Sequence, residues 1–226
     1  MVGIFVLSAG ATIWQTWAAT SSGEYRKYRL REPGDDPLAE VDKSRRTFLM
    51  VIYIACLWAV YLTGGYGWLI REEATGFAVA SVQVVAILLV YDFMFYWMHR
   101  AFHTPFLMRH VHYVHHMVCF PTAVDDYFLH PVDAFWVTTI FLLSVAFIGP
   151  LSTNTFLATL FVWVFINNIL HSGLNWPHPV LKPINFLARM HDAHHGPSTR
   201  SNFGSFFPFW DMMFGTYYRN KSDTAL

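Results

Sequence analysis

Three clusters of histidine are the residues of this 226-residue chain whose types and spacing could do chemistry. The spacings are His-x3-His or His-x2-His-His, so a helix would place the outer imidazoles of each cluster on one face. The clusters are His99–His103, His112–His115–His116 and His191–His194–His195, and His171 is an outlying member. The imidazole of histidine is the side chain that most often binds transition metals through nitrogen. The spacing therefore predicts a metal centre.

The number of imidazoles predicts more than one ion. Zinc sites usually take four ligands and octahedral metals about six, so these histidines are too many for a single ion. Two ions with about four or five protein ligands each would use them and leave positions open for dioxygen or substrate. Imidazole suits iron, zinc and copper, so the ligand type alone does not choose the metal. Only a metal that changes oxidation state, such as iron, can activate dioxygen.

Four polar residues near the clusters need separate interpretation. His130 precedes Pro131 at the start of an apolar segment and is a further candidate ligand, a neighbour that supports the ligands, or a plain interface residue. Asp92 lies seven residues before His99, inside an apolar segment where a carboxylate is costly and tends to be functional. It could orient a liganding imidazole or make a hydrogen bond between helices. We expect His110 and His178 to be surface residues.

The composition is that of a membrane protein, with 54% hydrophobic, 18% aromatic and only 13% charged residues. The formal net charge is zero, which argues against nucleic acid as a partner. Two distant cysteines, Cys56 and Cys119, give no basis for a disulfide framework, a zinc ribbon or an iron–sulfur cluster.

Five apolar segments are long enough to cross a bilayer as helices, which takes about 20 residues. They run approximately over Val2–Thr20, Thr47–Ile70, Gly76–Met98, Val132–Pro150 and Thr153–Leu170. The first is the weakest, because Ser8, Gly10 and Gln15 dilute it. We therefore expect an all-α integral membrane bundle of about four to five transmembrane helices with a cytoplasmic, histidine-rich helical cap. The chain reads as a single membrane domain over residues 1–226.

The distribution of basic residues predicts the orientation. With five spans and the amino terminus outside, all of the 15 Lys and Arg except Arg71 face the cytoplasm. Every histidine then falls on the cytoplasmic side as well. A tight turn around Gly149, Pro150 and Ser152 should return the chain to the surface that it left, which brings His171 next to the first two clusters.

The three clusters, in this order, resemble the histidine boxes of the fatty acid hydroxylase/sterol desaturase superfamily. The resemblance covers about residues 92–216, the expected catalytic region. It extends to these shorter motifs: Tyr96-Trp97, His130-Pro131, His171-Ser172-Gly173, Asn202-Phe203-Gly204, Trp210-Asp211 and Phe214-Gly215-Thr216.

The resemblance implies a membrane-embedded, non-haem di-iron enzyme that uses dioxygen as co-substrate and two electrons. Such an enzyme hydroxylates or desaturates a C–H position of a lipid-like substrate of fatty acyl or sterol type. The metal ligands implied are His99, His103, His112, His115, His116, His171, His191, His194 and His195. Zinc can replace iron on overexpression. Some acyl hydroxylases have a histidine where this chain has Asn175, so Asn175, like Asp92 and Asp211, is a residue that could support the centre.

Electrons should come from a separate protein, such as cytochrome b5, ferredoxin or a similar reductase system. The chain lacks the His-Pro-Gly-Gly motif of a fused cytochrome b5 domain and a glycine-rich dinucleotide fingerprint. The other expected partners are membrane lipids and the lipid-like substrate, in a bacterial inner membrane or the endoplasmic reticulum. Two alternatives remain open. One is a hydroxylase or ketolase of carotenoid-like isoprenoids, and the other is a metal-binding or metal-transport membrane protein.

Overall fold

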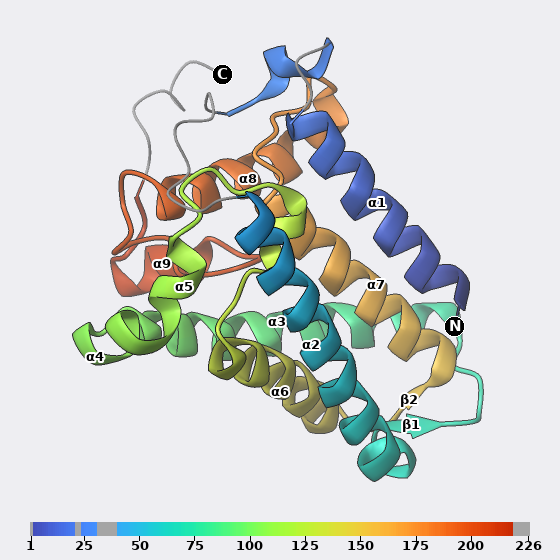
Figure 1. Ribbon diagram of the computed structural model, residues 1–226. Helices are drawn as coiled ribbons and strands as arrows, with labels where there is room; N and C mark the ends of the chain where they lie inside the picture. Colours follow the sequence, from blue (N-terminus) through green and yellow to red (C-terminus); the bar gives the residue numbers. More distant parts are fainter. Residues whose placement is uncertain (1, 21–23, 31–39, 219–226) are drawn as a thin grey trace.

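The computed structural model describes residues 2–20, 24–30 and 40–218, and it is nearly all-α (Figure 1). Its long helices are α1 (Val2–Thr20), α2 (Glu40–Leu69), α3 (Phe77–Phe102), α6 (Pro131–Ile148), α7 (Thr153–Leu170) and α8 (Lys182–His195). The short helical elements are η1 (Glu24–Tyr28), α4 (Pro105–Leu107), η2 (Met108–His112), α5 (Tyr113–His116), η3 (Ala123–Tyr127), η4 (Pro179–Leu181) and α9 (Phe209–Phe214). Two-residue strands β1 (Ile70–Arg71) and β2 (Leu151–Ser152) pair in parallel.

Four helices in the described part of the chain are long and apolar enough to span a membrane. These segments are Asp42–Gly65, Phe77–Phe102, Pro131–Ile148 and Thr153–Leu170. Their positions confirm four of the five expected spans, although the α2 span begins earlier than the sequence indicated. The helical start of α2 is polar, with Asp42 and Lys43, and apolar patterning alone does not detect it.

The fifth expected span, Val2–Thr20, forms α1 but is not among the helices apolar enough to span. Two of its polar residues, Thr12 and Gln15, are buried against the protein. The hydroxyl of Thr12 accepts a hydrogen bond from the Asn168 amide of α7 at 2.6 Å, and the Thr16 hydroxyl accepts one from the Val124 amide. Trp14 stacks on Trp176 with ring centroids 5.0 Å apart. Helix α1 therefore packs alongside α7 (Figure 1).

Helix α3 is the centre of the bundle, because it packs against both α6 and α7. Helix α2 covers α6 on one side, and α1 covers α7 on the other. Large buried side chains, among them Tyr91, Phe141 and Trp163, fill the space between these helices. At one end of the bundle β1 pairs with β2, where Gly149 turns the chain with a φ of 103° before Ser152 caps α7. The histidines lie at the opposite end.

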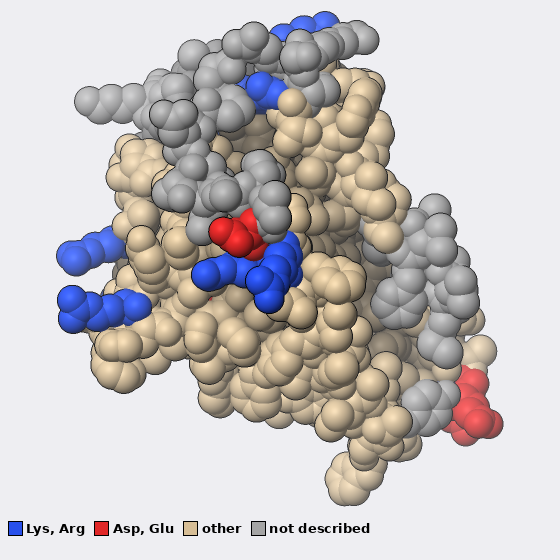
Figure 2. All heavy atoms as spheres, viewed as in Figure 1, with Lys and Arg blue, Asp and Glu red and all other residues tan. Residues whose placement is uncertain are grey.

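The opposite end of the bundle carries the cap, which is made of α4, η2, α5, η3, α8 and α9 (Figure 1). Lys43 at the start of α2 forms an ion pair with Asp125 of η3 at 3.0 Å, which fixes this end of α2 to the cap. Figure 2 shows Lys and Arg side chains over the cap, whereas the surface over α2 and α6 farther from it is almost free of charge. The cap is therefore the polar part of the molecule and positions the histidines.

Candidate metal centre

Nine histidines converge in two adjacent groups, each of which could hold a metal ion. The first group contains His99, His103, His112, His116 and His194. The second contains His115, His171, His191 and His195. Within each group the candidate ligand nitrogens all lie within 4.8 Å of one another. The nine are the histidines that the sequence singled out as ligands, and the division into five and four matches the expected number for two ions.

Helix geometry explains how neighbouring histidines reach different groups. On an α-helix, residues four apart are rotated by about 40° and residues three apart by about 60° in the opposite sense. His112 and His116 therefore stay together in the first group, while His115 between them turns to the second. In α8 the pattern is exchanged, because His191 and His195 join the second group and His194 the first. Each His-x2-His-His motif thus contributes to both groups.

Acceptors on the protein hold five of the imidazoles by their Nδ1 atoms. Because carbonyl and carboxylate oxygens only accept, each of these Nδ1 atoms carries the proton and donates it. The pairs are His99 with the Phe203 carbonyl (2.9 Å), His112 with the Asp133 carboxylate (3.1 Å), His115 with the Phe128 carbonyl (3.2 Å), His171 with the Asn167 carbonyl (3.0 Å) and His194 with the Ser201 carbonyl (2.7 Å). Their Nε2 atoms are left as bare lone pairs.

These lone pairs face one another at distances that suit two ligands of one ion. The Nε2 atoms of His99 and His112 are 3.1 Å apart, and those of His115 and His171 are 3.2 Å apart. Neither atom of either pair has a proton to share, so the contact is repulsive unless a cation lies beside both. With metal–nitrogen bonds of about 2.0–2.1 Å, neighbouring ligands of a tetrahedral or octahedral ion are separated by about 2.8–3.4 Å. The donor set therefore fits a metal in each group.

Burial favours the neutral form of His115, His116, His194 and His195, which is the form that binds metal. Desolvation is the main cause that lowers the pKa of His115 to about 3 and of His194 to about 4. The pKa values of His116 and His195 are lowered as well, chiefly by burial. Both ring nitrogens of these two histidines are buried without a hydrogen-bond partner in the described part of the chain. Bare buried nitrogens are costly in a protein unless a metal satisfies them.

Two buried carboxylates hold the backbone segment that supports His99. The amides of Phe203 and Gly204 donate to Asp211, and those of residues 205–207 donate to Asp92, over distances of 2.7 to 3.0 Å. The Phe203 carbonyl on this segment is the acceptor for His99. Asp92 therefore acts on His99 through this segment.

The backbone conformation of this segment explains why it carries the Asn202-Phe203-Gly204 motif. Asn202 has a φ of 56°, in the left-handed region, and its side chain bonds to the backbone of Met190 and Tyr218. A Cβ added to Gly204 would lie 2.9 Å from the Phe207 carbonyl and 3.0 Å from Asp211. Only glycine allows the chain to approach this closely.

Sequence reasoning missed Asp126 and Asp133. Asp133 holds His112, and Asp126 lies 3.3 Å from Nδ1 of His171. Both residues follow the second histidine cluster in the sequence. Asp133 could have been recognised, because it is a carboxylate at the start of an apolar span, directly after the His130-Pro131 motif. The carbonyl acceptors at Phe128, Ser201 and Phe203 have no sequence signal, because every residue has a carbonyl.

Four other residues considered from the sequence lie outside the two histidine groups. His130 caps α6, where its Nδ1 accepts from the Val132 amide. The side-chain oxygen of Asn175 accepts from Arg189 at 2.9 Å. His110 and His178 are exposed, as expected.

Comparison with known proteins gives the family. A family model described as fatty acid hydroxylase matches residues 84–216. The rice (Oryza sativa subsp. indica) protein named very-long-chain aldehyde decarbonylase GL1-11 is 29% identical over 217 residues, 88% of this chain and 77% of that protein. The Arabidopsis thaliana protein named methylsterol monooxygenase 2-1 is 31% identical over 161 residues, 61% of this chain and 56% of that protein. Methylsterol monooxygenase 1-1 of the same plant is 25% identical over 226 residues, 94% of this chain and 74% of that protein.

No solved structure matches the chain. The family match covers more than half of the sequence and includes every histidine of the two groups. It confirms the resemblance that the histidine boxes indicated and favours an enzyme over a metal transporter. This chain therefore belongs to the fatty acid hydroxylase family, and it is an oxygenase-type enzyme that acts on lipids.

Proposed function

We propose that the nine histidines hold two iron ions and that the protein oxidises a C–H position of a lipid-like substrate of fatty acyl or sterol type. The observation that carries the proposal is the pairing of bare Nε2 atoms within each histidine group. The names of the relatives support a lipid substrate, since they refer to a very-long-chain aldehyde and to methylsterols. Iron supplies oxidation with dioxygen when it is bound, and a separate protein donates the electrons.

The residues around the groups set the conditions for this chemistry. The backbone acceptors and Asp133 hold the imidazoles in one tautomer, so the ring nitrogens are aligned before the metal arrives. Eight of the nine histidines are buried, all but His103, and their burial excludes water from most of the centre. The apolar helices α3, α6 and α7 end at the groups, which gives a substrate from the bilayer a short route to them.

The metal content tests this proposal directly. Full-length protein, purified in detergent after expression with sufficient iron, is expected to contain close to two irons per chain by elemental analysis. Zinc can appear when expression exceeds the iron supply, because imidazole sites do not select against it by affinity. Lipid profiling of cells with and without the gene, under labelled dioxygen, should show the label in an oxidised lipid. Active protein with one metal per chain, or with none, would contradict the proposal.

The topology forms a second part of the proposal, in which the cap faces the cytoplasm. Arg71 lies at the β1–β2 end of the bundle, and the described basic residues of the cap, such as Lys43 and Arg109, lie at the histidine end. An excess of Lys and Arg marks the cytoplasmic side. Helix α1 runs beside α7 from the β1–β2 end toward the cap, which places the amino terminus outside if α1 spans the membrane (Figure 1).

Cysteine labelling tests this orientation. In a chain with Cys56 and Cys119 replaced by Ser, a membrane-impermeant thiol reagent added outside intact cells should label Glu73→Cys. It should not label Ser44→Cys or Pro197→Cys until the membrane is opened. All three positions are exposed, so a permeant reagent is a matched control for accessibility. Labelling of Ser44→Cys and Pro197→Cys from opposite faces would separate the histidines across the membrane and exclude a single two-metal centre.

A further inference from the structure

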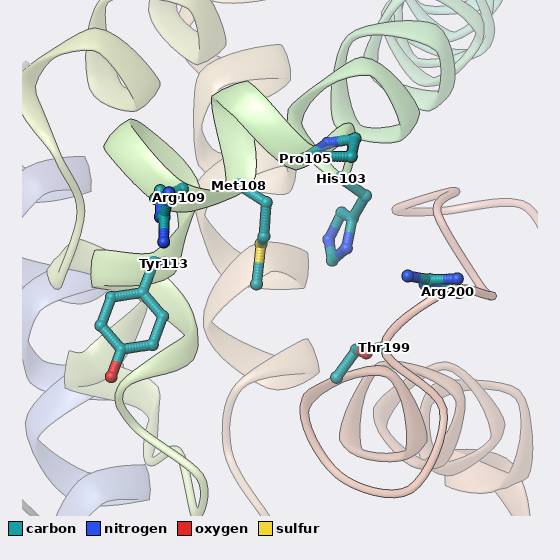
Figure 3. Close-up of a pocket in the computed structure, with 7 residues that line it drawn as sticks. All are labelled: His103, Pro105, Met108, Arg109, Tyr113, Thr199 and Arg200. Carbon is teal, nitrogen blue, oxygen red and sulfur yellow. The ribbon is translucent and has the colours of Figure 1, made fainter.

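His103 is the one histidine of the two groups that is not buried. Its Nε2 atom is buried without a hydrogen-bond partner in the described part of the chain. The ring itself lines a pocket of about 310 Å3 at the surface, together with Pro105, Met108 and Thr199 (Figure 3). The ring of His103 is therefore the part of the two groups that a partner outside the protein can contact.

Two exposed arginines lie on opposite sides of this pocket, with His103 and Met108 between them (Figure 3). Arg109 belongs to η2, and Arg200 belongs to the loop after α8. Within residues 2–20, 24–30 and 40–218, no ion pair joins either arginine to a carboxylate. Because the two guanidinium groups do not converge, one small anion cannot bind both. A protein surface with several carboxylates can pair with each of them separately.

The exposed Lys, Arg, Asp and Glu side chains of the catalytic region are all positive. Between residues 74 and 218 the chain has no Glu, and each of its Asp residues is buried or half-buried. These aspartates are Asp92, Asp125, Asp126, Asp133, Asp192 and Asp211. The exposed charged residues of the same stretch are Arg100, Arg109, Lys182 and Arg200. A surface with exposed charge of a single sign attracts partners of the opposite sign and steers their approach.

The side chains around the pocket have the composition of a protein–protein interface. Phe106, which follows Pro105, is 68% exposed, and Tyr113 is 56% exposed. Arg, Met and aromatic residues are enriched where proteins bind one another, whereas Lys and acidic residues are depleted. Weak electron-transfer complexes are the smallest class of interface and bury less than about 1,200 Å2, so a patch around one pocket can be sufficient.

We propose that an acidic one-electron carrier protein docks on the His103 surface, which consists of His103, Phe106, Arg109, Tyr113 and Arg200. The inference rests on the proposed function, in which a separate protein donates the electrons. The arginines pair with carboxylates of the carrier on both sides of His103, so the redox group of the carrier faces the imidazole ring. Lipid headgroups would be attracted by the same charges, but they do not account for the opening at a metal ligand.

The electron balance requires two dockings per turnover. Conversion of one C–H bond to C–OH by dioxygen consumes two electrons and two protons, and it releases one water. Each reduced carrier is oxidised by one electron at the His103 surface, and each of the two irons is reduced by one, while the protons come from water. A carrier that must leave after each electron should bind weakly, as salt-dependent complexes with small interfaces do.

Carrier binding tests the inference without turnover. The probes are two acidic carriers, a [2Fe–2S] ferredoxin and the soluble domain of cytochrome b5, and one basic carrier, cytochrome c. Each is titrated against full-length, metal-loaded protein in uncharged detergent. We expect Arg109→Glu and Arg200→Glu each to weaken binding of the acidic carriers by about tenfold or more, and higher salt to weaken it further. If neither acidic carrier binds more tightly than cytochrome c, the inference is overturned.

Lys182→Glu is the matched control. Lys182 is exposed at the start of α8, so this substitution changes the net charge of the cap by the same amount. About 18 Å of helix separates it from His194, and binding should fall by no more than about twofold. A loss as large as that of the arginine variants would indicate general attraction by positive charge and would overturn the inference. Arg109→Gln and Arg200→Gln, which remove the charge without reversing it, should give smaller losses in the same direction.

The rate of electron transfer shows whether docking serves the centre. In anaerobic rapid mixing, both arginine-to-glutamate substitutions should slow reduction of the centre by the acidic carriers by about tenfold or more. Dithionite, a small reductant that needs no docking site, should reduce the variants and the unaltered protein at similar rates. Equal slowing with dithionite would place the defect in the centre and overturn the assignment. So would weaker binding of the variants to phosphatidylserine vesicles with unchanged carrier binding, because that result indicates a membrane-binding surface.

Metal content, measured on every sample, separates this inference from the proposed function. Carrier binding that depends on Arg109 and Arg200 in protein without two irons would support the docking site and contradict the di-iron proposal. Two irons and turnover, with carrier binding unaffected by either substitution, would contradict the docking site alone. Unchanged melting temperatures of the variants would show that a loss of binding does not come from unfolding.

Discussion

Replacing His115 with Ala will abolish turnover and reduce the metal content, with a loss of at least about 100-fold in activity. Loss of a residue that merely supports a metal ligand costs about 10- to 100-fold, and loss of the ligand itself should cost more. His115 is buried, and its Nε2 lies 3.2 Å from that of His171 in the second histidine group. His103→Ala and His194→Ala should have the same effect through the first group. Turnover with a known lipid product and elemental analysis of the same preparation are the measurements.

Two kinds of variant make this result interpretable. His178→Ala removes an exposed imidazole outside both groups and should be nearly silent. Asp133→Asn keeps the shape of the side chain but weakens the acceptor for Nδ1 of His112, and it should lose about 10- to 100-fold in metal affinity. An inactive His178→Ala beside a fully active His115→Ala would show that the histidine groups are not the site.

Helix periodicity predicted that the histidines within each cluster share a face, because residues four apart lie on one side of a helix, and the family resemblance added His171. His99 and His103 needed only the continuation of α3 through Phe102, which the structure confirms. The distribution of the histidines over two groups could not be predicted. It depends on how α8 packs near α3 and α5. His194 of α8 joins histidines from the end of α3, η2 and α5, and His115 of α5 joins two histidines of α8. That arrangement is a tertiary contact with no local signal.

Helix α1 and Asp92 are two further cases in which a tertiary contact could not be predicted from the sequence. The sequence correctly indicated that Val2–Thr20 is the weakest span, but the burial of Thr12 and Gln15 depends on α7, which is distant in the chain. The sequence also marked Asp92 as functional because it is a carboxylate in an apolar helix. Its partners are backbone amides of residues 205–207, and amides carry no residue-specific pattern that could have identified them.

Replacing Asp92 with Ala will destabilise the whole protein, because Asp92 is fully buried and accepts three backbone N–H groups. Each buried donor left without an acceptor costs about 1–3 kcal/mol, so the total is several kcal/mol of a stability that is about 5–15 kcal/mol in typical domains. We expect the melting temperature in detergent to fall by about 10 °C or more. The metal content should fall with it, since the Phe203 carbonyl that holds His99 lies on the released segment.

Asp92→Asn distinguishes the loss of hydrogen bonds from the loss of volume. Asparagine keeps an oxygen for the amides of Ser205 and Phe206, but it can place an NH2 group opposite the Phe207 amide, where two donors would meet. Its melting temperature should therefore lie between those of Asp92→Ala and the unaltered protein. Glu73→Ala, which removes an exposed carboxylate at the other end of the bundle, should change the melting temperature by no more than about 2 °C. If Asp92→Ala melts like Glu73→Ala and keeps its metal, the segment at residues 203–207 is held by other contacts, and Asp92 does not position His99.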